Sequence, residues 1–243
     1  MTLENSKNQF KSIYLIGAIT TIIVLCGIVL DMIVGTITGG DISSLPQTAI
    51  DRFNQFNNNW ILGLYNLDLL NVIIQIITIP SIFAIYIAHK RTDNGYALLA
   101  LILFLIGTTI FITGNTALPM FELSKKYFFA ISDAQKNLIA AAGESMLAKG
   151  AHGSLGVFIG FALPTFSNIL ISHVMIKGQI FAKATSYIGF VGNILLLLYI
   201  VMVTFYPATE KVALMIAMPG GLLVMAWMIM YMIKLLKLRL IGN

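Results

Sequence analysis

Four polar side chains share one face of the second apolar segment of the chain. They are spaced by three, four and three residues and comprise Asp68, Asn71, Gln75 and Thr78. At about 100° per residue, this spacing places them within about 80° of one helix face. A carboxylate in hydrocarbon costs about 2.5–3.5 kcal/mol on insertion scales, so the stripe should face protein or a water-filled interior. Two interpretations stay open: one wall of a polar site, or hydrogen bonds that hold helices together.

A second group of polar residues borders the third and fourth apolar segments. Asn115 and Glu122 lie seven residues apart and share a face if the helix continues through Pro119. Glu144 precedes His152 by eight residues, at the start of the fourth segment. A carboxylate beside His152 would raise the pKa of the imidazole, although a histidine bonded to nearby backbone is an equally open interpretation.

These residues together form the predicted ligand-binding site. We expect the distant segments to meet in one pocket, whose members are Asp68, Asn71, Gln75, Asn115, Glu122, Glu144 and His152. We assign no catalytic residue and expect no metal or cofactor, because close His/His/carboxylate sets and nucleotide-binding glycine motifs are absent from the sequence.

The composition requires a bilayer around the elements that carry this site. Hydrophobic residues make up 58% of the chain and charged residues only 10%, against about a quarter charged in soluble domains. A soluble chain this apolar has too little polar surface to face water. The net charge of +5 comes from short clusters between apolar blocks, which argues against a nucleic-acid partner.

Six apolar blocks are long enough to cross the hydrocarbon core. They run near residues 14–34, 60–88, 96–116, 152–176, 184–206 and 212–236. We therefore predict an all-α, polytopic bundle of six spans that forms a single membrane-embedded domain over residues 1–243. A further helix over 133–148, with Ser132 as its N-cap, is too short and too charged to span. We expect this helix on the membrane surface, where it would bring Glu144 and His152 together.

The distribution of basic residues predicts the orientation. Lysines and arginines concentrate on the side of the two termini and of the even-numbered loops: Lys7, Lys11, Lys90, Arg91, Lys177, Lys183, Lys234, Lys237 and Arg239. The positive-inside rule then places both termini in the cytoplasm. The two long connections, residues 35–59 and 117–150, would face outward.

Several short segments together resemble a known family. They are DLLN at 68–71, GNTALP at 114–119, AGE at 142–144, GAHGS at 150–154 and MPGG at 218–221. The chain is similar in these segments to small bacterial multi-pass membrane proteins of unknown function. The resemblance extends from about residue 60 onward and implies a prokaryotic plasma membrane. It implies no activity and no functional residue.

Three functions are compatible with these observations. The first is a membrane protein that binds a small molecule, lipid or partner in an outward-facing polar pocket. The second is a small transporter or channel lined by the stripe that begins at Asp68. The third is an intramembrane enzyme that uses Asp68, Glu144 and His152 as acid and base groups. The stripe does not continue past Thr78, because Pro80 and Ile82 follow and Ser81 is rotated away, which favours the first function.

Overall fold

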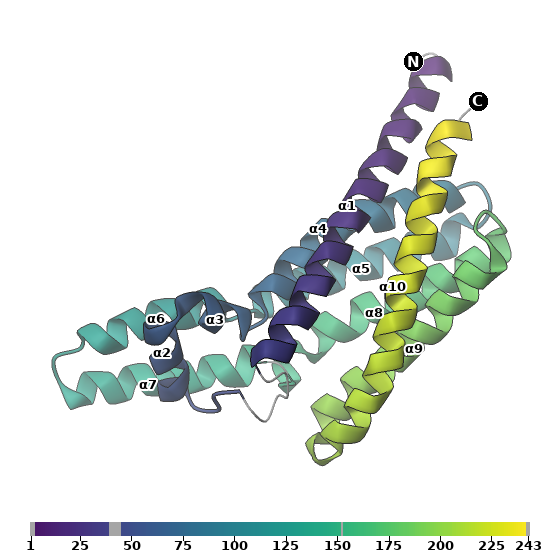
Figure 1. The fold of residues 1–243 in the computed structure, drawn as a ribbon. Coiled ribbons are helices and arrows are strands. Elements are labelled where there is room, and N and C mark those ends of the chain that lie inside the picture. Colours follow the sequence, from purple (N-terminus) through teal and green to yellow (C-terminus); the bar gives the residue numbers. More distant parts are fainter. Residues whose placement is uncertain (1–2, 39–44, 152, 242–243) are drawn as a thin grey trace.

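Helices make up almost all of the described chain (Figure 1). The computed structural model describes residues 3–38, 45–151 and 153–241, and no strand occurs among them. Six helices contain segments long and apolar enough to cross a membrane: α1 (Leu3–Thr38), α4 (Leu69–His89), α5 (Asn94–Gly114), α8 (Leu155–Gly178), α9 (Lys183–Phe205) and α10 (Glu210–Ile241). The predicted all-α bundle with six spans is confirmed.

The six spanning helices form a closed ring of neighbours. Going around the ring, α1 contacts α4, then α5, α8, α9 and α10 follow, and α10 contacts α1 again. Each helix runs antiparallel to the next, so the start of α1 and the end of α10 lie at the same end of the ring (Figure 1). We call this end proximal and the opposite end distal.

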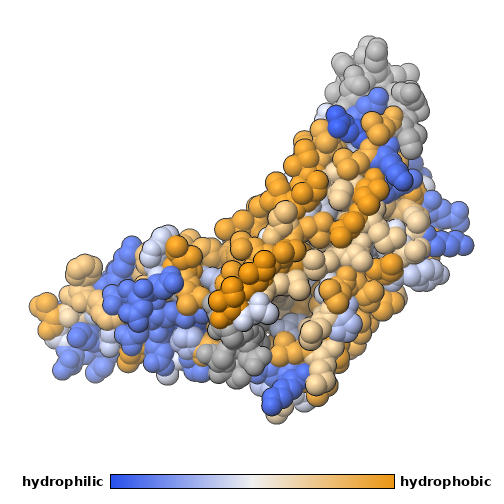
Figure 2. All heavy atoms as spheres, in the orientation of Figure 1, coloured by the Kyte–Doolittle hydropathy of each residue, from blue (hydrophilic) through white to orange (hydrophobic). Residues whose placement is uncertain are grey.

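Four shorter helices extend from the distal end of the ring (Figure 1). They are α2 (Ala49–Asn58), α3 (Trp60–Tyr65), α6 (Ala117–Phe129) and α7 (Asp133–Gly150). Helices α6 and α7 form a hairpin, and α2 contacts both of its arms. Figure 2 shows hydrophilic side chains gathered over these helices and hydrophobic ones over the visible face of the ring. This distribution fits a ring in lipid and a hairpin in water.

Two apolar cores hold these parts together. The larger core fills the proximal half of the ring and contains buried side chains of α1, α4, α5, α8 and α10, including Ile82, Met175 and Trp227. The smaller core lies among the distal helices, where Phe53 and Phe56 of α2 pack with Met120 and Leu147. Between the two cores lies the distal half of the ring, which contains the polar stripe.

One expectation about the elements needs correction, and another is confirmed. The second apolar block, predicted as one span over 60–88, is two helices, because the chain turns at residues 66–68 between α3 and α4. The surface helix predicted over 133–148 is present as α7, and Ser132 accepts the predicted capping hydrogen bond from the Gln135 amide. It packs against α6 and α2, so protein contacts hold it in place.

Candidate binding site at the distal end of the ring

The site begins at the turn that separates α3 from α4. Asp68 ends this turn with φ of 62° and ψ of 21°, in the left-handed region. A residue other than glycine costs of order 1–3 kcal/mol in such a region, and such residues cluster at functional sites. Asp tolerates this region better than most residues. The turn thereby places Asp68, the first residue of the stripe, at the N-cap position of α4.

Two side chains from other helices hold the backbone of this turn. The guanidinium Nη1 of Arg52, on α2, donates to the carbonyl oxygen of Asn66 at 3.2 Å. The Nδ2 of Asn115 donates to the carbonyl oxygen of Leu67 at 2.6 Å. Asn115 also accepts a hydrogen bond from the amide of Ala117 at 3.1 Å, which starts α6. The turn therefore joins α2, α4 and the break between α5 and α6.

Arg52 and Asp68 are two buried side chains of opposite charge beside the turn. Their exposed fractions are 4% and 8%. Burial lowers the pKa of Arg52 to about 10, and the negative charge of Asp68 opposes that shift. Arg52 therefore stays protonated at neutral pH. Asp68 in turn accepts a hydrogen bond from Nδ2 of Asn71 at 3.0 Å, one turn further along α4.

The polar stripe faces the inside of the ring. Asn71, Gln75 and Thr78 are half-buried, whereas Ile73 and Ile76, on the other side of α4, are exposed. Continuing the same spacing of three and four residues leads to Ile82, Ile85 and His89. Ile82 and Ile85 belong to the proximal core that α4 shares with α1, α5, α8 and α10. The shared spacing shows that the stripe points to the same interior.

Both the polarity and the exposure of the side chains on this face of α4 change between Thr78 and Ile82. Distal to this point, Asn71, Gln75 and Thr78 keep partial exposure, whereas Asp68 at the start of the stripe is buried. Ile82, Ile85 and His89 are 1%, 0% and 0% exposed. Along one line on α4, an accessible polar surface thus gives way to a closed apolar core.

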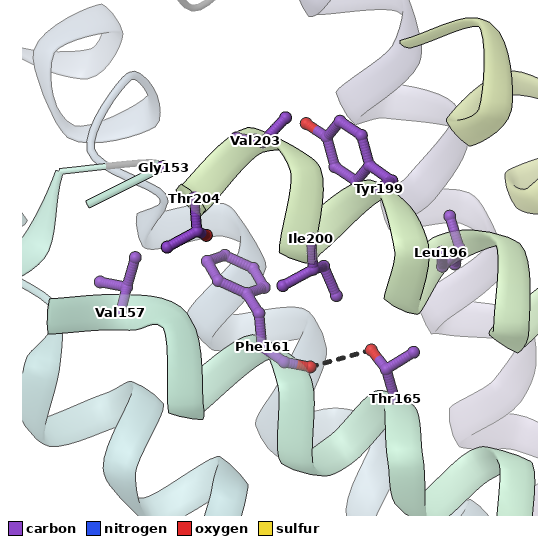
Figure 3. A pocket seen from close by; sticks show the side chains of 9 residues that line it. All are labelled: Gly153, Val157, Phe161, Thr165, Leu196, Tyr199, Ile200, Val203 and Thr204. Carbon is purple, nitrogen blue, oxygen red and sulfur yellow. Dashed lines mark hydrogen bonds between the residues drawn. The ribbon is translucent and has the colours of Figure 1, made fainter. Parts of the chain in front are cut away.

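A cavity of about 200 Å³ lies between α8 and α9 in the same distal half (Figure 3). Val157 and Phe161 on α8 line one side, and Ile200 and Thr204 on α9 line the other. Tyr199 also lines the cavity, and its hydroxyl lies within electrostatic range of the Asp68 carboxylate. The cavity and the polar stripe thus both lie in the distal half of the ring.

The remaining predicted site residues are not all brought to this region. Glu122 is exposed and pairs with Lys126, with Oε1 and Nζ 3.5 Å apart. A helix does run through Pro119, as part of α6, but it does not continue from Asn115, where the chain leaves the helical conformation before α6 begins. Asn115 and Glu122 therefore do not share a face.

Glu144 and His152 have different outcomes. The Oε1 of Glu144 accepts a hydrogen bond from the amide of Ala49 at 2.7 Å, and thereby satisfies one of the free N–H groups in the first turn of α2. Glu144 is thus a cap that ties α7 to α2. His152 lies outside the described residues.

Metal binding receives no support from the described part of the chain. Among those residues, no three His, Cys, Asp or Glu side chains come together in a way that would hold a metal ion. The chemistry available near the turn is that of one carboxylate, one guanidinium and several carboxamides and hydroxyls.

The sequence profile of a family described as "Domain of unknown function (DUF4386)" matches residues 12–234. The chain belongs to this family. The match confirms the resemblance to a family of unknown function and extends it to residue 12, through most of the first spanning helix. Neither a curated protein nor a solved structure matches the chain.

Two residues of the site in this DUF4386 chain were missed from the sequence. Arg52 carried a usable signal, because it falls on the same helical face as Ala49, Phe53 and Phe56, which are all buried. An arginine on the apolar face of a helix needs a partner or a polar surrounding. Tyr199 carried no such signal, because one tyrosine within an apolar span is compatible with lipid contact or packing.

Proposed function

We propose that the protein is a membrane-embedded binding protein whose distal interior takes up a small amphipathic molecule. The observation that carries this proposal is one face of α4, which is polar and partly accessible at Asn71, Gln75 and Thr78 and apolar and closed at Ile82 and Ile85. An interior that is open at one end and filled at the other suits a binding site. It does not suit a continuous channel.

The chemistry of the region favours a ligand with a polar end and an apolar end. Asp68, Asn71 and Gln75 offer hydrogen-bond acceptors and donors on one side of the interior. The cavity between α8 and α9, in the same distal half of the ring, is lined mainly by apolar side chains and has a volume of about 200 Å³. An apolar cavity of about 150 Å³ is large enough for a benzene ring. The apolar part of the ligand is therefore a ring or a short chain.

The orientation of the protein determines which side supplies this ligand. Basic residues concentrate on the proximal side, beside the termini, and the positive-inside rule then places that side in the cytoplasm. We place the protein in the plasma membrane of a prokaryote, with the distal interior open to the outside of the cell. The ligand then enters from the cell exterior without crossing the membrane.

Thermal unfolding in detergent tests the binding function. The purified protein is unfolded in the presence of a panel of small amphipathic amines, carboxylic acids and amino-acid esters, each at several concentrations. A ligand at 100 times its Kd adds about 2.7 kcal/mol to the stability of the folded state. We expect at least one compound to raise the melting temperature of the wild type and to lose that effect in Asp68→Asn. Compounds that stabilise both proteins equally, or none at all, would contradict the proposed site.

A further inference from the structure

A groove of about 560 Å³ lies between α1 and α4 near the distal end, beneath α3. On α4 it is lined by Leu69, Leu70 and Ile73, which lie on the side of the helix opposite the polar stripe. The groove is therefore separate from the proposed interior site. Its volume falls within the usual range of about 300–1,000 Å³ for small-molecule sites.

The packing of α1 on α4 explains why the groove is there. Deep in the ring the two helices are in close contact, since a Cβ atom at Gly17 would lie 2.5 Å from the Cβ of Ala84. Nearer the distal end, a Cβ at Gly27 would still meet Ile74 at 3.0 Å, whereas one at Gly35 would meet only the Tyr65 hydroxyl, at 3.5 Å. The helices therefore diverge towards the distal end and leave a space between them.

Helix α3 is tied over this space by Tyr65. The hydroxyl of Tyr65 donates to the carbonyl oxygen of Asp31, on α1, at 3.0 Å. Burial and the nearby Asp31 carboxylate raise the pKa of Tyr65 above its usual range, so the hydroxyl keeps its proton and remains a donor. The roof of the groove is thus anchored to both α4 and α1.

The lining of the groove is apolar at depth and polar only at its distal end. Leu30 and Val34 of α1 and Leu70 and Ile73 of α4 line the groove, and the polar groups belong to Asn59, the N-cap of α3, and to Tyr65 of α3. Trp60, at the start of α3, is 54% exposed. Tryptophan at the end of a spanning region is typical of the membrane–water interface. The groove therefore runs from the interface into the hydrocarbon layer.

We infer that this groove holds one acyl chain of a membrane lipid from the distal leaflet, with the lipid's polar part beside α3. The groove lining changes from polar beside α3 to apolar deeper in the membrane, which is the same order as the polar headgroup and the acyl chain of a lipid in that leaflet. The exposed rim residues, such as Leu30, Ile61 and Ile73, face the hydrocarbon from which the chain enters. This lipid site is independent of the ligand site inside the ring.

Native mass spectrometry with two matched pairs of variants tests the inference. Ile73→Trp fills the groove from α4, and Ile76→Trp adds the same bulk at a similarly exposed residue outside it, with exposed fractions of 47% and 44%. Leu30→Trp and Ile33→Trp form the corresponding pair on α1, each 50% exposed. Each protein is purified in mild detergent with added phosphatidylglycerol and phosphatidylethanolamine and then exchanged into lipid-free detergent.

We expect wild type, Ile76→Trp and Ile33→Trp to retain one phospholipid per chain after the exchange. Ile73→Trp and Leu30→Trp should lose it while keeping a cooperative thermal transition. Equal lipid retention in both members of each pair would overturn the inference. So would a dimer mass in wild type that disappears only in the two groove-filling variants, because a second copy of the chain would then occupy the groove. If one groove-filling variant does not fold, the pair on the other helix decides.

Discussion

The Nδ2 atom of Asn115 lies 2.6 Å from the carbonyl oxygen of Leu67 and donates a hydrogen bond to it. This bond joins the end of α5 to the turn before α4, across 48 residues of sequence. The same side chain starts α6 by accepting from the Ala117 amide. The Asn115 carboxamide thus stabilises both the turn between α3 and α4 and the break between α5 and α6. Both lie at the distal end of the ring.

Removal of this carboxamide should destabilise the distal end. Asn115→Ala leaves the buried Leu67 carbonyl without its donor, and an unsatisfied buried acceptor costs about 1–3 kcal/mol. Asn137→Ala, at an exposed position on α7, is the control and should have little effect. Thermal unfolding in detergent measures both. Equal melting temperatures for the two variants would show that the Asn115 bond contributes nothing to stability.

The buried charges of Arg52 and Asp68 should be energetically coupled. Arg52→Met removes the donor to the Asn66 carbonyl together with a positive charge that acts on Asp68, whereas Asp68→Asn removes the negative charge that acts on Arg52. In the double variant both charges are absent, so the loss should be smaller than the sum of the single losses, by about 0.5–3 kcal/mol. Chemical denaturation of the four proteins measures this coupling. Additive losses would contradict a charge interaction.

The pKa of Arg52 also determines how this coupling depends on pH. Because burial lowers this pKa to about 10, the folded state disfavours the charged form. The resulting cost is fully present below pH 10 and is relieved only as the pH rises through about 10. The stability difference between wild type and Arg52→Met should therefore be constant from pH 6 to pH 8.5. A slope in that interval would assign the effect to another titrating group.

Glu144 should act locally, as the cap of α2. Glu144→Ala removes the acceptor of the Ala49 amide, and loss of a helix cap costs about 0.5–2 kcal/mol. Hydrogen exchange should accelerate over residues 49–58, with little change in the proximal half of the ring. The exposed Glu122 provides the control, since Glu122→Ala leaves α2 intact. Unchanged exchange in α2 after Glu144→Ala would contradict the capping role.

Close packing of α5 on α8 should depend on Gly160. A Cβ atom at this position would lie 2.9 Å from the Cα of Phe111, so a larger side chain forces the two helices apart. Gly160→Val should lower stability by about 1–3 kcal/mol, the usual cost of overpacking. Gly95 and Gly221 have no atom within 4 Å of such a Cβ, so Gly221→Val is the matched control. Thermal unfolding distinguishes the two outcomes.

The spans were predictable because the bilayer fixes their length and composition. Apolar runs of about 20 residues are unambiguous, and the fifth span, predicted over 184–206, is α9 at Lys183–Phe205. The break in the second block was not predictable from hydropathy, because residues 60–67 are almost as apolar as those that follow. The turn at residues 66–68, with Asp68 in the left-handed region, separates α3 from α4 there.

The candidate site was predictable where a periodic pattern carried it. The stripe on α4 follows from spacing within one helix, and its side chains lie on the inner face of that helix. The position of Glu122 depended on whether one helix continues past Asn115. The spacing of the polar residues is the same with or without a break there, so the sequence pattern could not decide between the two. Arg52 reaches the turn from a different helix, 14 residues away from Asn66. Such contacts depend on tertiary packing that spacing does not encode.

Accessibility along α4 tests the proposed function at its central point. In a Cys26→Ser background, single cysteines replace Gln75, Thr78, Ile82 and Ile76 in turn, with Lys136→Cys as the reporter of the distal side. A small, charged methanethiosulfonate reagent is added to intact cells and, separately, to inside-out vesicles. Modification is counted by mass spectrometry.

We expect the cysteines at positions 75 and 78 to react from the same side as the one at position 136. Those at positions 82 and 76 should react from neither side, because one lies in the closed core and the other faces lipid. Reaction at position 82, or reaction at positions 75 and 78 from the side of the termini, would contradict an interior that opens only at the distal end.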